Sequence, residues 1–143
     1  ALAPEWLTKE IRKVHQFVTF SVSTPFQYGI AQYLENHMED LAQLNHFFQR
    51  KRDLFLSLME GTPFEPLPSE GTYFQTMTYN QISQEPDHKF VQTLTREAGV
   101  AAIPISAFYE DKQDHGVIRF CFAKDEETLK AAAERLKNWL GKR

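Results

Sequence analysis

The sequence predicts an α+β fold, in which a small, antiparallel-rich sheet packs against helices. Two segments, residues 72–79 and 116–123, alternate in the way expected of half-buried strands. From Phe64 onward the predicted order is strand, strand, helix, strand, strand, helix, which suits one sheet with helices on one face. With 143 residues, 13% of them aromatic, the chain is long enough to bury a substantial core.

The first part of the chain is predicted to be helical. Pro4 and Glu5 suit the start of a helix whose apolar residues recur at helical spacing as far as Val18. Thr24 and Pro25 predict the cap and first turn of a second helix, which ends near Asn36.

A third helix is predicted from Met38 to Glu60, closed by Gly61. At 1.5 Å per residue it would be roughly 35 Å long, well above the average helix. We expect such a helix to reach beyond one compact domain. We therefore place a domain boundary near His37, which divides the chain into residues 1–37 and 38–143.

The pattern changes after Gly61. Three prolines surround a short extended piece at residues 64–67, and Glu70-Gly71 predicts a turn before the strand at 72–79. Pro86-Asp87 opens a helix that Gly99 ends.

The remaining elements complete the predicted sheet. Residues 100–105 are predicted to form a short strand, and Pro104 indicates that this strand lies at an edge or ends there. Residues 106–115 are predicted to be a polar loop. Asp125 caps a last helix that ends at Gly141.

Composition excludes several classes of function. The net charge of −3 and pI near 6.0 give no electrostatic basis for binding nucleic acid or a membrane surface. No apolar run is long enough to span a bilayer. The single cysteine, Cys121, excludes an internal disulfide and favours a reducing, cytoplasmic compartment; we expect it to be an inert, buried thiol. No histidine pairs with another residue at metal-ligand spacing, so no metal site is predicted.

Arg119 is the candidate binding residue, because it interrupts an otherwise apolar strand. Ile118 and Phe120 occupy one face of that strand, whereas Arg119 and Cys121 occupy the other. A guanidinium is rarely buried without a partner, and its fork of donors matches a carboxylate. The residues alone leave two readings open: an ordinary exposed or salt-bridged arginine, or an anion site.

Several segments, in order along the chain, carry a resemblance to a known family. They are residues 3–5, 15–16, 20–27, 51–53, 68–74, 99–104 and 117–124. Together they resemble the C-terminal part of pyridoxal-phosphate (PLP) aminotransferases of fold type I, and most closely the kynurenine and methionine aminotransferase-like branch. The resemblance covers essentially the whole chain.

The resemblance implies a fold and a set of site residues. In this α/β PLP-transferase fold, residues 1–37 would be helices of the large cofactor-binding domain, and 38–143 the linking helix and small domain. Arg119 would bind the α-carboxylate of an amino acid or 2-oxo acid. Tyr73 would approach the substrate, although a packing role is an equal alternative. Phe20 and Ser21 would reach into the partner active site of a homodimer, unless Phe20 belongs to the core; some members carry histidine in place of Ser21.

The resemblance also implies what the chain lacks. The family's Schiff-base lysine and most PLP ligands would precede Ala1, so no catalytic residue is assigned here. We expect a C-terminal fragment, inactive without the N-terminal part of the same enzyme, with exposed apolar surface on its first two helices. A non-catalytic carboxylate-binding module and a PLP-dependent lyase of the same fold are the alternatives.

Overall fold

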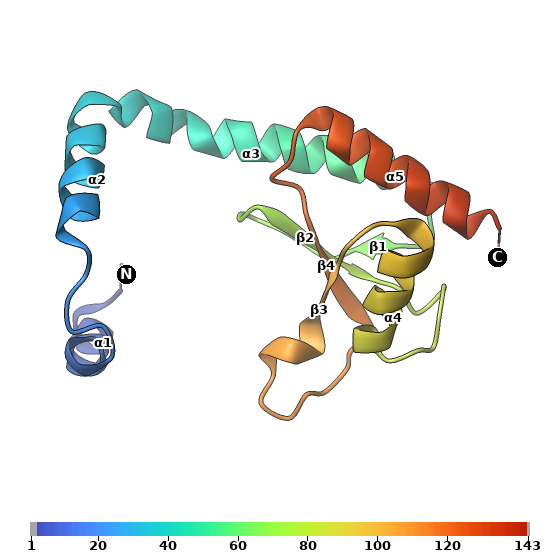
Figure 1. Cartoon of the computed structure of the whole chain (residues 1–143), viewed down its shortest axis with the longest axis horizontal. Helices are drawn as coiled ribbons and strands as arrows, with labels where there is room; N and C mark the ends of the chain where they lie inside the picture. Colours follow the sequence, from blue (N-terminus) through green and yellow to red (C-terminus); the bar gives the residue numbers. More distant parts are fainter. Residues whose placement is uncertain (1–2, 143) are drawn as a thin grey trace. The chain divides into compact units, whose positions relative to one another are not determined.

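The computed structural model describes residues 3–142, which form two compact units (Figure 1). The first unit extends to Ala42 and the second begins at Gln43. The helix α3 (Met38–Met59) contributes residues to both. The assignment of residues 1–37 and 38–143 to a large and a small domain stays a prediction.

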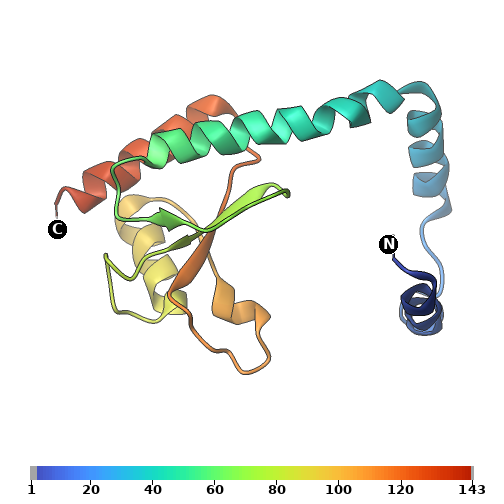
Figure 2. The same cartoon turned by 180° about the vertical axis from the view of Figure 1, so that it is seen from behind.

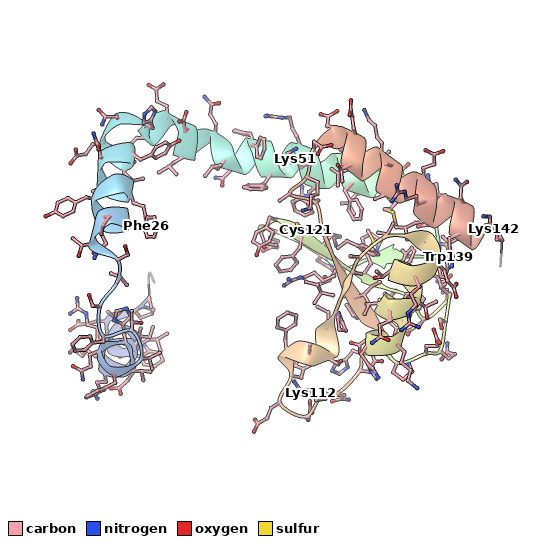
Figure 3. The ribbon with its side chains drawn as sticks, in the orientation of Figure 1. Phe26, Lys51, Lys112, Cys121, Trp139 and Lys142 are labelled. Carbon is pink, nitrogen blue, oxygen red and sulfur yellow. The ribbon has the colours of Figure 1, made fainter. Side chains whose placement is uncertain are left out.

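The first unit is built from α1 (Glu5–Val18), α2 (Thr24–Asn36) and the start of α3. Ser23, one residue before the predicted cap, is the N-cap of α2, and Pro25 lies in the first turn. Neither α1 nor α2 contains a buried residue. Phe26, which projects from α2 in Figure 3, is 74% exposed. The expected apolar surface on these two helices is therefore confirmed.

The second unit contains a four-stranded antiparallel sheet in the order β1-β2-β4-β3. Its strands are β1 (Glu65–Pro66), β2 (Phe74–Thr78), β3 (Ile103–Pro104) and β4 (Val117–Cys121). β4 lies in the middle, with β2 on one side and β3 on the other. Pro104 lies in the edge strand β3, as predicted, a place in a sheet where proline is tolerated.

Helices complete the second unit. They are the later part of α3, α4 (Asp87–Thr93) with the π-helical turn Leu94–Ala98 that continues it, and α5 (Glu126–Leu140). Gly99 has a φ of 67° and ends the turn in the left-handed conformation that favours glycine. Figures 1 and 2 both draw α5 and the later part of α3 above the strands. The α+β class predicted from the sequence is confirmed.

The core lies between one face of the sheet and the helices. Met77 of β2 and Ile118 of β4 are fully buried on that face of the sheet. Leu136, on the helix α5, is fully buried as well. The ring of Phe120 lies 5.8 Å from that of Phe55, which α3 supplies. Every second residue of β2 and β4 faces this core, so the intervening residues, Arg119 among them, face away.

Two expectations are wrong. Cys121 is exposed instead of buried, because strand alternation places it on the same face as Arg119. Residues 106–115 are not all loop, since Ile105–Phe108 forms a 3₁₀ turn directly after β3. A 3₁₀ turn is too short to leave a periodic apolar pattern in a sequence.

Candidate functional site

Arg119 lies at the centre of β4, on the face of the sheet that points away from the core. Thr76 of β2 is directly opposite it in the ladder, and Ile103 of β3 is opposite it on the other side. Its side chain is half-buried. A central strand with a paired neighbour on each side is a rigid mount for a binding group.

Two aromatic rings pack against the Arg119 guanidinium. Its central carbon lies 4.4 Å from the ring centre of Phe74, in β2, and 5.2 Å from that of Phe108, in the 3₁₀ turn. Both distances are within the range of cation–π attraction. The rings limit the conformations open to the side chain and leave its charge unneutralised.

Arg119 has no acidic partner within the part of the chain that the structure describes. None of the ion pairs or hydrogen bonds found among residues 3–142 involves its guanidinium. Arg52 is a useful contrast, because it pairs with Asp53 at 2.8 Å and donates to the Ser69 carbonyl at 2.9 Å. A half-buried cation that lacks an internal anion is suited to binding one from outside.

Arg119 also lines a cavity of about 500 Å³ in the second unit. Small residues of the 99–103 segment and the first part of α5 form much of its wall. Lys124 and Arg135 line it too, so the described lining of this cavity includes three basic residues and no acidic one. The electrostatic environment therefore favours an anionic ligand.

Tyr73 lies one residue before β2 and is 50% exposed. Its ring meets that of Phe74 edge-on, at 5.6 Å between centres. It lines a different cavity, of about 460 Å³, together with Arg52 and Phe122. The structure thus connects Tyr73 to the Arg119 site through Phe74, and its role at a substrate stays a prediction.

Phe20 and Ser21 lie in the first unit, in the connection between α1 and α2. Phe20 has a φ of 56°, a left-handed conformation that is unusual for a bulky residue, and it is 91% exposed. The Ser21 N–H donates to the Thr19 carbonyl at 2.6 Å. The Phe20 side chain therefore lies in solvent. The alternative that Phe20 packs in a core is wrong for the core formed by residues 3–142.

The lysines of the described chain do not form a PLP cradle. Lys51 is half-buried and donates to the Lys124 carbonyl at 2.5 Å, while the other lysines among residues 3–142 are exposed. A Schiff-base lysine needs a buried environment that controls the protonation of its amine, and none of the lysines described here is buried. In the same described range, no three His, Cys, Asp or Glu side chains group as metal ligands.

The sequence did not identify two of the groups that define this site. Phe74 could have been found, because alternation along β2 places it on the face of Thr76, opposite Arg119. Phe108 could not, since nothing in the local pattern indicates that residues 105–108 turn toward β4. The polar pair Asp87 and Ser106, which anchors that turn, was also missed.

Comparison with known proteins gives the family. The model of the family "Aminotransferase class I and II" matches residues 1–136. The chain belongs to this aminotransferase family. Enzymes of the family depend on PLP.

Individual relatives of the aminotransferase family agree with this placement. Methionine aminotransferase of Escherichia coli is 48% identical over 136 residues, which are 95% of this chain and 35% of the relative. Human kynurenine–oxoglutarate transaminase 1 is 31% identical over an alignment 159 residues long, which covers 96% of this chain and 38% of the relative. A solved Escherichia coli structure with a reported methionine aminotransferase function superposes with a TM-score of 0.80 at 47% identity, covering 96% of this chain and 36% of that one.

The chain therefore spans little more than a third of the length of these aminotransferases, and the part it matches is C-terminal. Over the described residues, no helix combines the length and the apolar character needed to cross a membrane.

Proposed function

We propose that the whole protein to which this chain belongs is a PLP-dependent aminotransferase. It moves an amino group between an amino acid, of the methionine, aromatic or kynurenine kind, and a 2-oxo acid. The observation that carries the proposal is Arg119, a rigidly mounted cation with no acidic partner among residues 3–142. The names of the relatives support the choice of substrates.

Arg119 binds the α-carboxylate that amino acids and 2-oxo acids share. Two parallel N–H groups of its guanidinium donate to the two carboxylate oxygens, which fixes the plane of the carboxylate as well as its position. Because Cα is bonded to that carboxylate, the grip also orients the Cα–H and Cα–N bonds. Such orientation decides which bond is placed for reaction, and it is the contribution of this chain.

The group that reacts with the substrate lies elsewhere in the protein. PLP supplies the electron sink of the reaction, and the lysines described here do not fit it. We therefore assign the Schiff-base lysine and most PLP ligands to a part of the protein outside this chain. Transamination by the 143-residue chain alone is not expected.

The remaining residues have proposed roles at the same site. Tyr73 contributes an aromatic wall, and Phe20 and Ser21 serve the active site of the second subunit in a homodimer. The exposure and backbone strain of Phe20 support this role, because a strained and solvated aromatic needs a compensating contact.

We assign residues 1–37 to the large domain and 38–143 to the small domain, and place the enzyme in the cytoplasm.

The test compares Arg119 variants of the whole enzyme on two substrates. For an amino acid, Arg119→Ala should lower kcat/KM about 30-fold or more, because a charge-assisted pair contributes about 2 kcal/mol. Arg119→Lys should restore only part of the loss, since an ammonium cannot bind bidentately. The corresponding amine, which lacks the carboxylate, should respond little to either change.

Arg96→Ala is the matched control, because Arg96 is exposed and, among residues 3–142, bonds only to Gln92 on its own helical segment. An equal loss on both substrates, or no loss on either, would contradict the role of Arg119. Carboxylate binding without turnover would favour the non-catalytic module. Bond cleavage without amino transfer would favour a PLP-dependent lyase.

A further inference from the structure

Asp87 is a buried carboxylate that the proposed function does not use. Its side chain, at the start of α4, is only 1% exposed. Oδ2 accepts from the Ser106 backbone N–H at 2.8 Å, and Oδ1 accepts from the Ser106 hydroxyl at 2.7 Å. His88 Nδ1 lies further away, 3.9 Å from Oδ1. Because two charge-assisted bonds come from one residue, Asp87 fixes both the place and the orientation of Ser106.

Ser106 lies in the 3₁₀ turn that carries Phe108. The turn follows β3, whose Ile103 is paired with Arg119. Two residues after Ser106, Phe108 is 62% exposed, yet its ring lies 5.2 Å from the Arg119 guanidinium. An exposed side chain has few contacts to hold it, so the position of Phe108 depends on the anchoring of its turn.

The far end of the same loop is anchored to α4 as well. The Asp114 carboxylate accepts from the backbone N–H of Asp87 at 2.7 Å and from that of Gly116 at 2.8 Å. The intervening residues 107–113 are exposed, and Lys112 projects from them in Figure 3. Phe108 therefore lies two residues from the anchored end at Ser106.

We propose that Asp87 is a positioning residue for the Arg119 site, acting through Ser106 and Phe108. Asp87 holds the 3₁₀ turn, the turn holds the Phe108 ring against the guanidinium, and the ring reduces the rotamer freedom of Arg119. A cation that is already ordered loses less entropy when it binds a carboxylate. The last step rests on the proposed function, whereas the ordering of Arg119 does not.

Four variants separate this role from a general effect on folding. Asp87→Ala removes both acceptors. Asp87→Asn keeps the shape, and its amide can accept from the Ser106 N–H and donate to the hydroxyl, so it should rescue the site. Phe108→Ala removes the ring and leaves the buried pair intact. Tyr109→Ala is the control, because Tyr109 is an exposed ring in the same loop that packs against His115.

The first measurement needs no ligand: the NMR order parameter of the Arg119 Nε–Hε group in the 143-residue chain. Asp87→Ala and Phe108→Ala should lower it to below about 0.6, the range of flexible groups, whereas Asp87→Asn and Tyr109→Ala should leave it near the unsubstituted value. An unchanged order parameter in folded Asp87→Ala and Phe108→Ala would overturn the proposal. If Asp87→Ala does not fold, Ser106→Ala replaces it under the same criterion.

The second measurement uses the whole enzyme. Asp87→Ala and Phe108→Ala should raise KM for the amino acid about threefold to tenfold with a smaller change in kcat, since ordering one side chain costs about 0.5–1.5 kcal/mol. A loss of order without a rise in KM would overturn the proposed carboxylate role of Arg119 and leave the positioning intact. A rise in KM without loss of order would overturn the positioning.

Discussion

The backbone of Gly116 lies against the side chain of Asn80, immediately before β4 begins at Val117. A Cβ atom at position 116 would overlap the Asn80 amide, and the φ of Gly116 is 66°. The Gly116 carbonyl also accepts from the Tyr79 N–H at 3.1 Å. A side chain at position 116 would therefore have to displace the Asn80 side chain and adopt a left-handed backbone, and the hydrogen bond fixes the point at which β4 joins the ladder with β2.

We therefore expect Gly116→Ala to destabilise the second unit. The new methyl group combines a clash with a left-handed backbone, so the free energy of unfolding should fall by about 1–3 kcal/mol. Urea unfolding followed by circular dichroism measures the change. Gly71→Ala is the control, since a Cβ there meets nothing within 4 Å and the φ is not left-handed, and it should change stability by less than about 0.5 kcal/mol. Equal effects of both substitutions would show that Asn80 does not constrain Gly116.

A pH-dependent contribution to stability is expected at the start of α5. The Asp125 carboxylate accepts from the backbone N–H of Thr128 at 2.7 Å and from its hydroxyl at 2.9 Å. These bonds favour the charged form and lower the pKa of Asp125 below its ordinary value. A lowered pKa in the folded state stabilises the protein above the ordinary pKa, and this stabilisation is lost as the pH falls through the folded value.

The free energy of unfolding should therefore be higher for the unsubstituted chain than for Asp125→Ala at pH 7. This difference should become smaller as the solution becomes acidic. NMR titration of the carboxyl carbon should give a low pKa for Asp125, which rises in Thr128→Ala because the hydroxyl donor is lost. Asp111→Ala, in an exposed loop, serves as the control for unspecific charge effects. A stability difference that does not vary with pH would contradict the cap.

The sequence predicted the elements whose signals are local. Helical spacing with capping residues located α1, α2 and α5, and Gly99 marked the end of the α4 segment. Alternation in β4 separated Ile118 and Phe120 from Arg119 correctly. The same alternation should have placed Cys121 on the exposed face, but its two phenylalanine neighbours in sequence favoured burial. Alternation was the better guide, because neighbours along a strand point to opposite faces.

The surroundings of Arg119 depend on contacts distant in sequence, and the sequence could not predict them. Phe108 reaches Arg119 because a short 3₁₀ turn is held by Asp87, 19 residues before Ser106. Neither the turn nor the buried pair leaves a periodic pattern. The proposed carboxylate role of Arg119 came from resemblance, whereas its lack of an acidic partner within residues 3–142 came from the structure.

The two tryptophans can test whether the first unit is exposed and the second unit has a buried core. Trp6 of α1 is 69% exposed, whereas Trp139 of α5 is 6% exposed, and its indole N–H donates to Glu97 at 2.8 Å. In the 143-residue chain, Trp139→Phe leaves Trp6 as the emitter, and its fluorescence should be red-shifted and readily quenched by acrylamide. Trp6→Phe leaves Trp139 as the emitter, and its fluorescence should be blue-shifted and resist quenching. In the whole enzyme, Trp6 should become shielded if the apolar faces of α1 and α2 pack against another part of the protein. A shielded Trp6 in the isolated chain at low concentration would contradict its exposure, and an exposed Trp6 in the whole enzyme would contradict the assignment of residues 1–37 to a large domain.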